Sequence, residues 1–178
     1  ATEVKPDLPN WPRSPTGLGG FDLAIGPSRD SGGTAWPVLA ELKWSTGGGD
    51  KVGEALWDAF KLAHASALPD VEATYLITGA PSVAWDRSPS GSELFGDART
   101  DTVDLVTRHA KLWRWNRDYG AKDWPQKFPS AIQTRLVDDV TVDTATGEWR
   151  ILISSVRGVD GWIDAVDGWP QGVEPPPA

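Results

Sequence analysis

The chain of 178 residues contains no cysteine, no methionine and only two histidines, His64 and His109. Without cysteine there is no disulfide framework, no thiol chemistry and no thiolate metal site. Neither histidine lies in a ligand motif, so both are expected to be structural, which argues against a histidine-rich zinc site. A metal bound by this chain would therefore be held by oxygen atoms.

Long apolar runs are also missing. No segment approaches the roughly 18 consecutive apolar residues that a membrane span needs, and no signal-peptide pattern opens the chain. Hydrophobic residues make up 39% and charged residues 24% of the sequence, which is typical of a globular domain with a real core. We expect one cytoplasmic domain over residues 1–167 and a Pro-rich, disordered tail over residues 168–178.

Three charged residues stand in two segments that otherwise read as buried strands. Asp22 lies within the apolar run 21–25, and Glu41 and Lys43 lie within the apolar run 37–44. Side chains alternate along a strand, so Glu41 and Lys43 share one face. The turn-rich segment 26–33 between the runs predicts an antiparallel hairpin with a long connection, which would bring Asp22 close to Glu41.

The segments that follow predict a helix and then another strand. Apolar residues recur with helical spacing over residues 51–68, and Pro69 ends the pattern. Residues 73–79 read as a strand that a helical crossover would place parallel to 37–44. Glu54 and Asp58 of the helix are candidates to support a site. The alternative is a solvated helix face with Asp58 and Lys61 paired three residues apart.

An Asp in one strand followed by Glu-x-Lys in the next resembles the PD-(D/E)XK nuclease superfamily. The resemblance covers roughly residues 20–80 and implies an α/β fold with a restriction-endonuclease-like three-layer core, in which helices flank a central mixed sheet. The family core usually opens with a helix before the Asp strand. No such helix is visible in the twenty Pro- and Gly-rich residues that precede Phe21.

The resemblance also implies a chemistry. Mg²⁺ or Mn²⁺ would be held by Asp22, Glu41 and the Leu42 backbone carbonyl, and hard oxygen ligands suit both ions. Lys43 would orient or deprotonate the attacking water and offset charge on the phosphate. The implied reaction is hydrolysis of a phosphodiester bond in nucleic acid, DNA more often than RNA.

Charge bears on the partner of such a site. The net charge is −8, and such a field repels nucleic acid, so binding is expected to be weak or assisted by a protein partner. A helix expected over residues 102–119 runs against this average, because its second half carries Arg108, Lys111, Arg114 and Arg117. These cations could contact phosphates while neighbouring indoles stack on bases. Equally, they could complement the helix carboxyl end.

Three further readings stay open. Glu41 and Lys43 could form the solvated face of an amphipathic strand, with Asp22 paired to Lys43 or to a loop amide. The chain could also be a catalytically inactive nuclease-fold module that binds a protein partner. Eleven tryptophans also permit a carbohydrate-binding domain. Towards the carboxyl end, residues 135–142 and 149–156 predict a β-hairpin across a Gly-containing loop.

Overall fold

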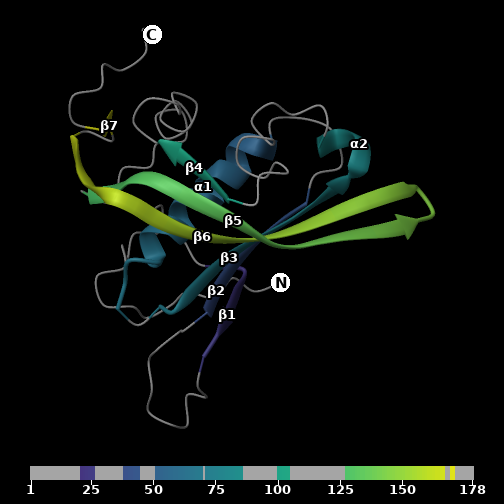
Figure 1. Ribbon diagram of the computed structural model, residues 1–178, viewed down its shortest axis with the longest axis horizontal. Helices are drawn as coiled ribbons and strands as arrows, with labels where there is room; N and C mark the ends of the chain where they lie inside the picture. Colours follow the sequence, from purple (N-terminus) through teal and green to yellow (C-terminus); the bar gives the residue numbers. More distant parts are fainter. Residues whose placement is uncertain are drawn as a thin grey trace, which may run out of the picture.

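The computed structural model describes residues 21–26, 38–44, 51–69, 71–85, 100–104, 127–166 and 169–170. Most of them belong to one mixed β-sheet (Figure 1). The elements in chain order are β1 (Leu23–Ile25), β2 (Val38–Trp44), α1 (Lys51–Ala65), β3 (Ala73–Pro81), α2 (Ser82–Trp85), β4 (Thr100–Asp104), β5 (Lys127–Thr144), β6 (Gly147–Val166) and β7 (Trp169–Pro170). The described part is thus mainly β-sheet with few helices, broadly consistent with the expected α/β class.

The sheet has the strand order β1-β2-β3-β6-β5-β4, and β7 pairs with β6. Strands β1 and β2 are antiparallel, which confirms the predicted hairpin. Strands β2 and β3 are parallel, with Glu41 opposite Leu76 and Lys43 opposite Thr78, so α1 is the crossover that the sequence predicted. All other described pairings are antiparallel.

Helix α1 covers one face of the sheet and forms the core with it. It lies behind β5 and β6 in the view of Figure 1. The largest fully buried side chains come from α1, from β2 and β3, and from the residue before Asp22: Phe60, Leu62, Leu39, Leu76 and Phe21. The helix ends at Ala65 rather than near residue 68, because two turns closed by the carbonyls of His64 and Ala65 lead the chain into Pro69.

The helix approaches β6 closely at Gly158. The Gly158 N–H donates to Ser66 Oγ at 3.0 Å, and that hydroxyl donates to the Ala63 carbonyl at 2.7 Å. A Cβ atom on Gly158 would lie 2.7 Å from Pro129 Cβ and 3.0 Å from the Ala63 oxygen. A glycine is needed here because the helix backbone and a rigid ring leave no room for a side chain.

Strand β1 is not the buried strand that its apolar sequence predicted. Phe21 is fully buried, but Leu23 is 41% and Ile25 54% exposed, and Asp22 is exposed. The physical reason is position: β1 is a three-residue strand at the edge of the sheet, where neighbours cover one side of the chain. An apolar pattern shows that residues can be buried, but the strand order decides whether they are.

The predicted helix over residues 102–119 is wrong at its start. Residues 102–104 belong to β4, which pairs with β5 and places Val103 opposite Ile132. Threonine and valine favour strands, and pairing with a partner far along the chain overrides a weak helical pattern. Residues 105–119 lie outside the described ranges. Residues 80–81 complete β3 and residues 82–85 form α2, while residues 86–99 are not described.

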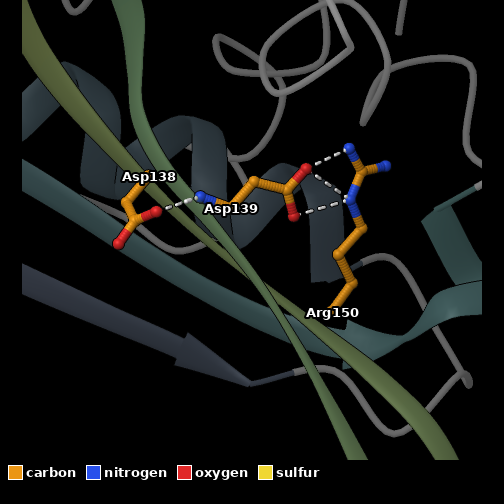
Figure 2. Close-up of polar contacts among 3 residues, drawn as sticks. All are labelled: Asp138, Asp139 and Arg150. Atoms are coloured by element: carbon orange, nitrogen blue, oxygen red, sulfur yellow. Dashed lines mark hydrogen bonds and ion pairs between the residues drawn. The ribbon is translucent and has the colours of Figure 1, made fainter.

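The predicted carboxyl-terminal hairpin is present and is longer than expected. Strands β5 and β6 pair from Lys127 with Asp164 to Thr144 with Gly147, where a positive φ of 119° at Gly147 favours glycine. Their far ends form a ribbon that extends beyond the other strands in Figure 1. On this ribbon Arg150 grips both carboxylate oxygens of Asp139, and Asp138 accepts the Asp139 N–H at 2.9 Å (Figure 2).

Two further observations complete the fold. Trp169 and Pro170 pair with β6 as β7, although they fall within the segment expected to be a disordered tail. The remainder of that segment is not described. Among the helices of the described ranges, none has the length and apolar character needed to cross a bilayer.

Candidate metal and phosphate site

Strand β2 presents Glu41 and Lys43 to the face of the sheet that α1 covers. Alternation along the strand places Trp44 on the opposite face. There its ring packs over Gly79 of β3, at a point where a Cβ atom would overlap the indole. The Trp44 and Trp149 ring centroids lie 6.4 Å apart. Glu41 and Lys43 therefore lie on one face of the sheet at the carboxyl end of β2, and Trp44 lies on the other face beside Trp149.

Helix α1 provides an oppositely charged partner for each of the two charged residues of β2, Glu41 and Lys43. Lys43 Nζ lies 3.0 Å from Asp58 Oδ2, and Lys61 Nζ forms an ion pair with Glu41 Oε1. Lys61 Nζ also lies 4.0 Å from Asp58 Oδ1. Glu41, Asp58 and Lys61 are buried, whereas the Lys43 side chain is 26% exposed. Charges of alternating sign thus line the interface between β2 and α1, and Lys43 lies nearest to solvent.

Asp22, directly before the edge strand β1, joins this cluster. The register of β1 places Leu23 opposite Ala40, which brings Asp22 alongside Glu41. Asp22 Oδ2 accepts the Leu42 N–H at 2.8 Å. In a strand the N–H and C=O of one residue point toward the same neighbouring strand, so we expect the Leu42 carbonyl to face Asp22 as well. The residues that the resemblance named therefore lie together in space.

The electrostatics of the cluster follow from its burial. Loss of solvation raises the pKa of Glu41 to about 8, against the opposing effect of Lys61, while Asp58 and Asp22 raise it further. The pKa of Asp58 is also raised, first by burial and against the effects of Lys43 and Lys61. Two buried carboxylates are thus costly to ionise together, and an added cation would stabilise their charged forms.

A buried hydroxyl faces the same space. Thr78 of β3 is opposite Lys43 in the register and 3% exposed, and alternation places its side chain on the α1 face. Within the described residues, Thr78 Oγ1 has no hydrogen-bond partner. Buried polar atoms are normally paired, so an orphan beside a charged cluster is suited to a polar ligand.

The donor set fits a hard divalent cation. Asp22, Glu41 and the Leu42 carbonyl supply oxygen atoms, and Mg²⁺ commonly takes one or two carboxylates while water and substrate phosphate complete its shell. Among the described residues, no group of three or more acidic or histidine side chains is arranged to coordinate a metal ion. A cation held by Asp22, Glu41 and the Leu42 carbonyl would have its remaining coordination positions filled by water and phosphate oxygens.

The other predicted site residues divide into two groups. Glu54 lies on α1, but its side chain is not described, and Arg108, Lys111, Arg114, Arg117 and His109 all lie outside the described ranges. His64 is buried on α1, with its ring edge-on to Trp162 and 5.3 Å away between centroids. Burial lowers the pKa of His64 to about 4, so the ring is neutral near pH 7.

Lys61 is the site residue that the sequence reasoning missed. The expectation of a solvated helix face for Asp58 and Lys61 is wrong, because both are 5% exposed. The apolar composition of this half of the helix was a usable signal. Among the side chains of α1 that the structure describes, buried apolar residues lie on both sides of the pair: Ala55, Ala59, Phe60, Leu62, Ala63 and Ala65.

A scan against protein-family models and searches of the curated proteins and of the solved structures give no match for this chain.

Proposed function

We propose that this protein hydrolyses phosphodiester bonds of nucleic acid in a metal-dependent reaction, with DNA more suitable than RNA as substrate. The observation that supports the proposal most strongly is the hydrogen bond from the Leu42 N–H to Asp22. It joins an Asp directly before β1 to the Glu-x-Lys strand beside it, in the order typical of PD-(D/E)XK nucleases. Asp22, Glu41 and Lys43 would form the active site.

The arrangement of elements supports a restriction-endonuclease-like core. A β1–β2 hairpin, the crossover helix α1 and the parallel strand β3 follow one another as that fold requires. Helix α1 forms one outer layer on the sheet. The proposed three-layer core also needs helices on the opposite face, where Trp44 and Trp149 lie.

In this proposal Asp22, Glu41 and the Leu42 carbonyl hold Mg²⁺ or Mn²⁺. When bound, the ion would polarise a phosphoryl oxygen and lower the pKa of a bound water. Asp58 holds the Lys43 ammonium at the open side of the cluster, where it can orient the attacking water and offset charge on the phosphate. The Thr78 hydroxyl can donate a hydrogen bond to a phosphate oxygen or to a water beside Lys43.

The charges near the site favour weak or partner-assisted binding of nucleic acid. The β5–β6 ribbon leaves the sheet at the end where β3 pairs Pro81 with Trp149, the same end that Lys43 approaches. Between residues 137 and 150 the ribbon carries one basic residue, Arg150, and four acidic residues: Asp138, Asp139, Asp143 and Glu148. Because phosphate contacts supply most non-specific affinity, a basic partner protein would assist the substrate to approach.

One observation favours a second candidate function. Lys61 and Asp58 already neutralise Glu41 and Lys43, as in a buried ion-pair network that only fixes the packing of a helix on a sheet. The protein would then be a nuclease-fold module that binds a protein partner without catalysis. The carbohydrate-binding reading stays a prediction.

Cleavage assays separate these candidates. Purified protein is incubated with labelled single-stranded DNA, double-stranded DNA and RNA, with Mg²⁺, Mn²⁺ or EDTA. We expect metal-dependent cleavage, and a loss of at least about 100-fold in rate for Asp22→Asn, Glu41→Gln and Lys43→Met. Asp139→Asn is the matched control, because it removes a carboxylate on the ribbon. Cleavage that is absent with every substrate, or equal in all variants, would refute the nuclease proposal.

A further inference from the structure

The Lys61 ammonium occupies an enclosed position among groups that attract cations. Besides its ion pair with Glu41 and its 4.0 Å approach to Asp58, Lys61 Nζ lies 5.3 Å from the centroid of the Phe21 ring. A cation near an aromatic face is stabilised by the ring quadrupole. Since Phe21 directly precedes Asp22, the ammonium is enclosed by the same residues that border the proposed metal position.

The charges of the cluster depend on what else is bound. Asp22, Glu41 and Asp58 oppose the two ammonium groups, Lys43 and Lys61, so the ionised cluster carries one net negative charge. A divalent cation alone would leave a net charge of +1 in a largely buried site, where uncompensated charge is costly. A phosphodiester contributes one negative charge. The cluster is therefore neutral when the cation and the diester are both present.

The two ammonium groups are placed to share an anion. Lys43 Nζ and Lys61 Nζ contact opposite oxygens of one carboxylate, that of Asp58. A lysine ammonium sits on a flexible stem and carries three donors, so it can exchange one acceptor for another by rotation about its side-chain bonds. Glu41 has no such freedom, because it projects from a strand in the middle of the packed interface.

We infer that Lys61 is an internal counter-cation that competes with the divalent metal for Glu41, and that a phosphodiester relieves this competition by drawing the ammonium away. This inference rests on the proposed function. It makes Lys61 a positioning residue rather than a catalytic one. Metal and diester then bind cooperatively, and linkage requires each to raise the affinity of the other by the same factor.

The test measures metal affinity rather than turnover. Mn²⁺ binding is followed by electron paramagnetic resonance of the free ion, with and without dimethyl phosphate, a diester of charge −1 that resists hydrolysis. In the wild-type protein we expect the diester to raise Mn²⁺ affinity at least about 5-fold. Lys61→Gln keeps hydrogen-bond donors but removes the charge, so it should bind Mn²⁺ about 5-fold or more tighter without the diester, and the effect of the diester should largely disappear.

Two variants make the result specific. Arg150→Gln removes a positive charge from the ribbon and should leave both affinities as in the wild type. Lys61→Arg keeps the charge and can grip Glu41 through two donors, so it should bind Mn²⁺ more weakly than the wild type while the effect of the diester persists. If circular dichroism shows that Lys61→Gln does not fold, the Lys61→Arg variant still tests the inference.

The outcomes distinguish failure of the role inferred for Lys61 from failure of the proposed metal site. If the wild type binds Mn²⁺ at Asp22 and Glu41 but neither Lys61 variant changes the affinity, the inference is overturned and the metal site stands. An unchanged Mn²⁺ affinity on addition of dimethyl phosphate to the wild type would also overturn it. If no variant binds Mn²⁺ under any condition, the metal site itself fails, and the inference fails with it.

Discussion

His64 should make the stability of the protein depend on pH in a defined direction. Its pKa is about 4 in the folded protein and 6.5 in the unfolded chain, because burial disfavours the imidazolium. The folded state therefore binds fewer protons than the unfolded state between these values. The stabilising contribution is fully present above pH 6.5 and is lost as the pH falls toward 4.

The magnitude follows from the separation of the two pKa values. They lie about 2.5 pH units apart, which corresponds to about 3 kcal/mol when the whole interval is crossed. At pH 5.0, inside the interval, about 2 kcal/mol of the stability at pH 7.5 should already be lost through His64. Other titrating groups add their own effects, so the contribution of His64 is obtained by comparison with a variant.

Urea unfolding monitored by tryptophan fluorescence at pH 7.5 and pH 5.0 measures this effect. His64→Gln removes the titrating ring and keeps a side chain of similar size. We expect the free energy of unfolding to fall by about 2 kcal/mol more in the wild type than in the variant over this pH interval. Equal pH dependence in both proteins would refute the placement of His64 in the core, and with it the packing of α1 that brings Asp58 and Lys61 into the cluster.

Three further substitutions test the packing. Gly158→Ala should destabilise the protein by about 1–3 kcal/mol in urea unfolding, because the added Cβ meets the α1 backbone; an unchanged midpoint would contradict that close approach. Gly79→Ala should cost about 1–2 kcal/mol in the wild type but almost nothing in a Trp44→Ala background, whereas equal costs would show that the indole does not lie over Gly79. The ion pair of Arg150 with Asp139 is partly exposed, so a double-mutant cycle should give about 0.2–1 kcal/mol, decreasing in 1 M NaCl; a larger, salt-insensitive value would indicate a buried pair.

Local pattern and chain order were sufficient to predict the framework of the site. Alternation along β2 separates Glu41 and Lys43 from Trp44 without any knowledge of the fold. The connection between the two apolar runs predicts their antiparallel pairing, and the following helix predicts that β3 runs parallel to β2. These rules act over short distances along the chain, and the sequence contains them directly.

The remaining features depend on contacts between distant residues. Exposure of Ile25 follows from the edge position of β1, which only the complete strand order determines. The assignment of Thr102 to a strand depends on its pairing with Gln133, about thirty residues further along the chain. Lys61 is buried because α1 packs its charged side chain against Glu41 of β2, whereas helical periodicity alone favours a solvent-exposed Lys61.

The Mn²⁺ binding isotherm of the wild-type protein, compared with that of Asp22→Asn, tests the central claim most directly. The claim is that Asp22, directly before β1, and Glu41 on β2 hold one divalent cation between them. We predict one Mn²⁺ site in the wild type and in the Asp139→Asn control, weakened at least about 10-fold in Asp22→Asn because a charged ligand is lost. Equal affinity in all three proteins, or no binding in the wild type, would contradict the account.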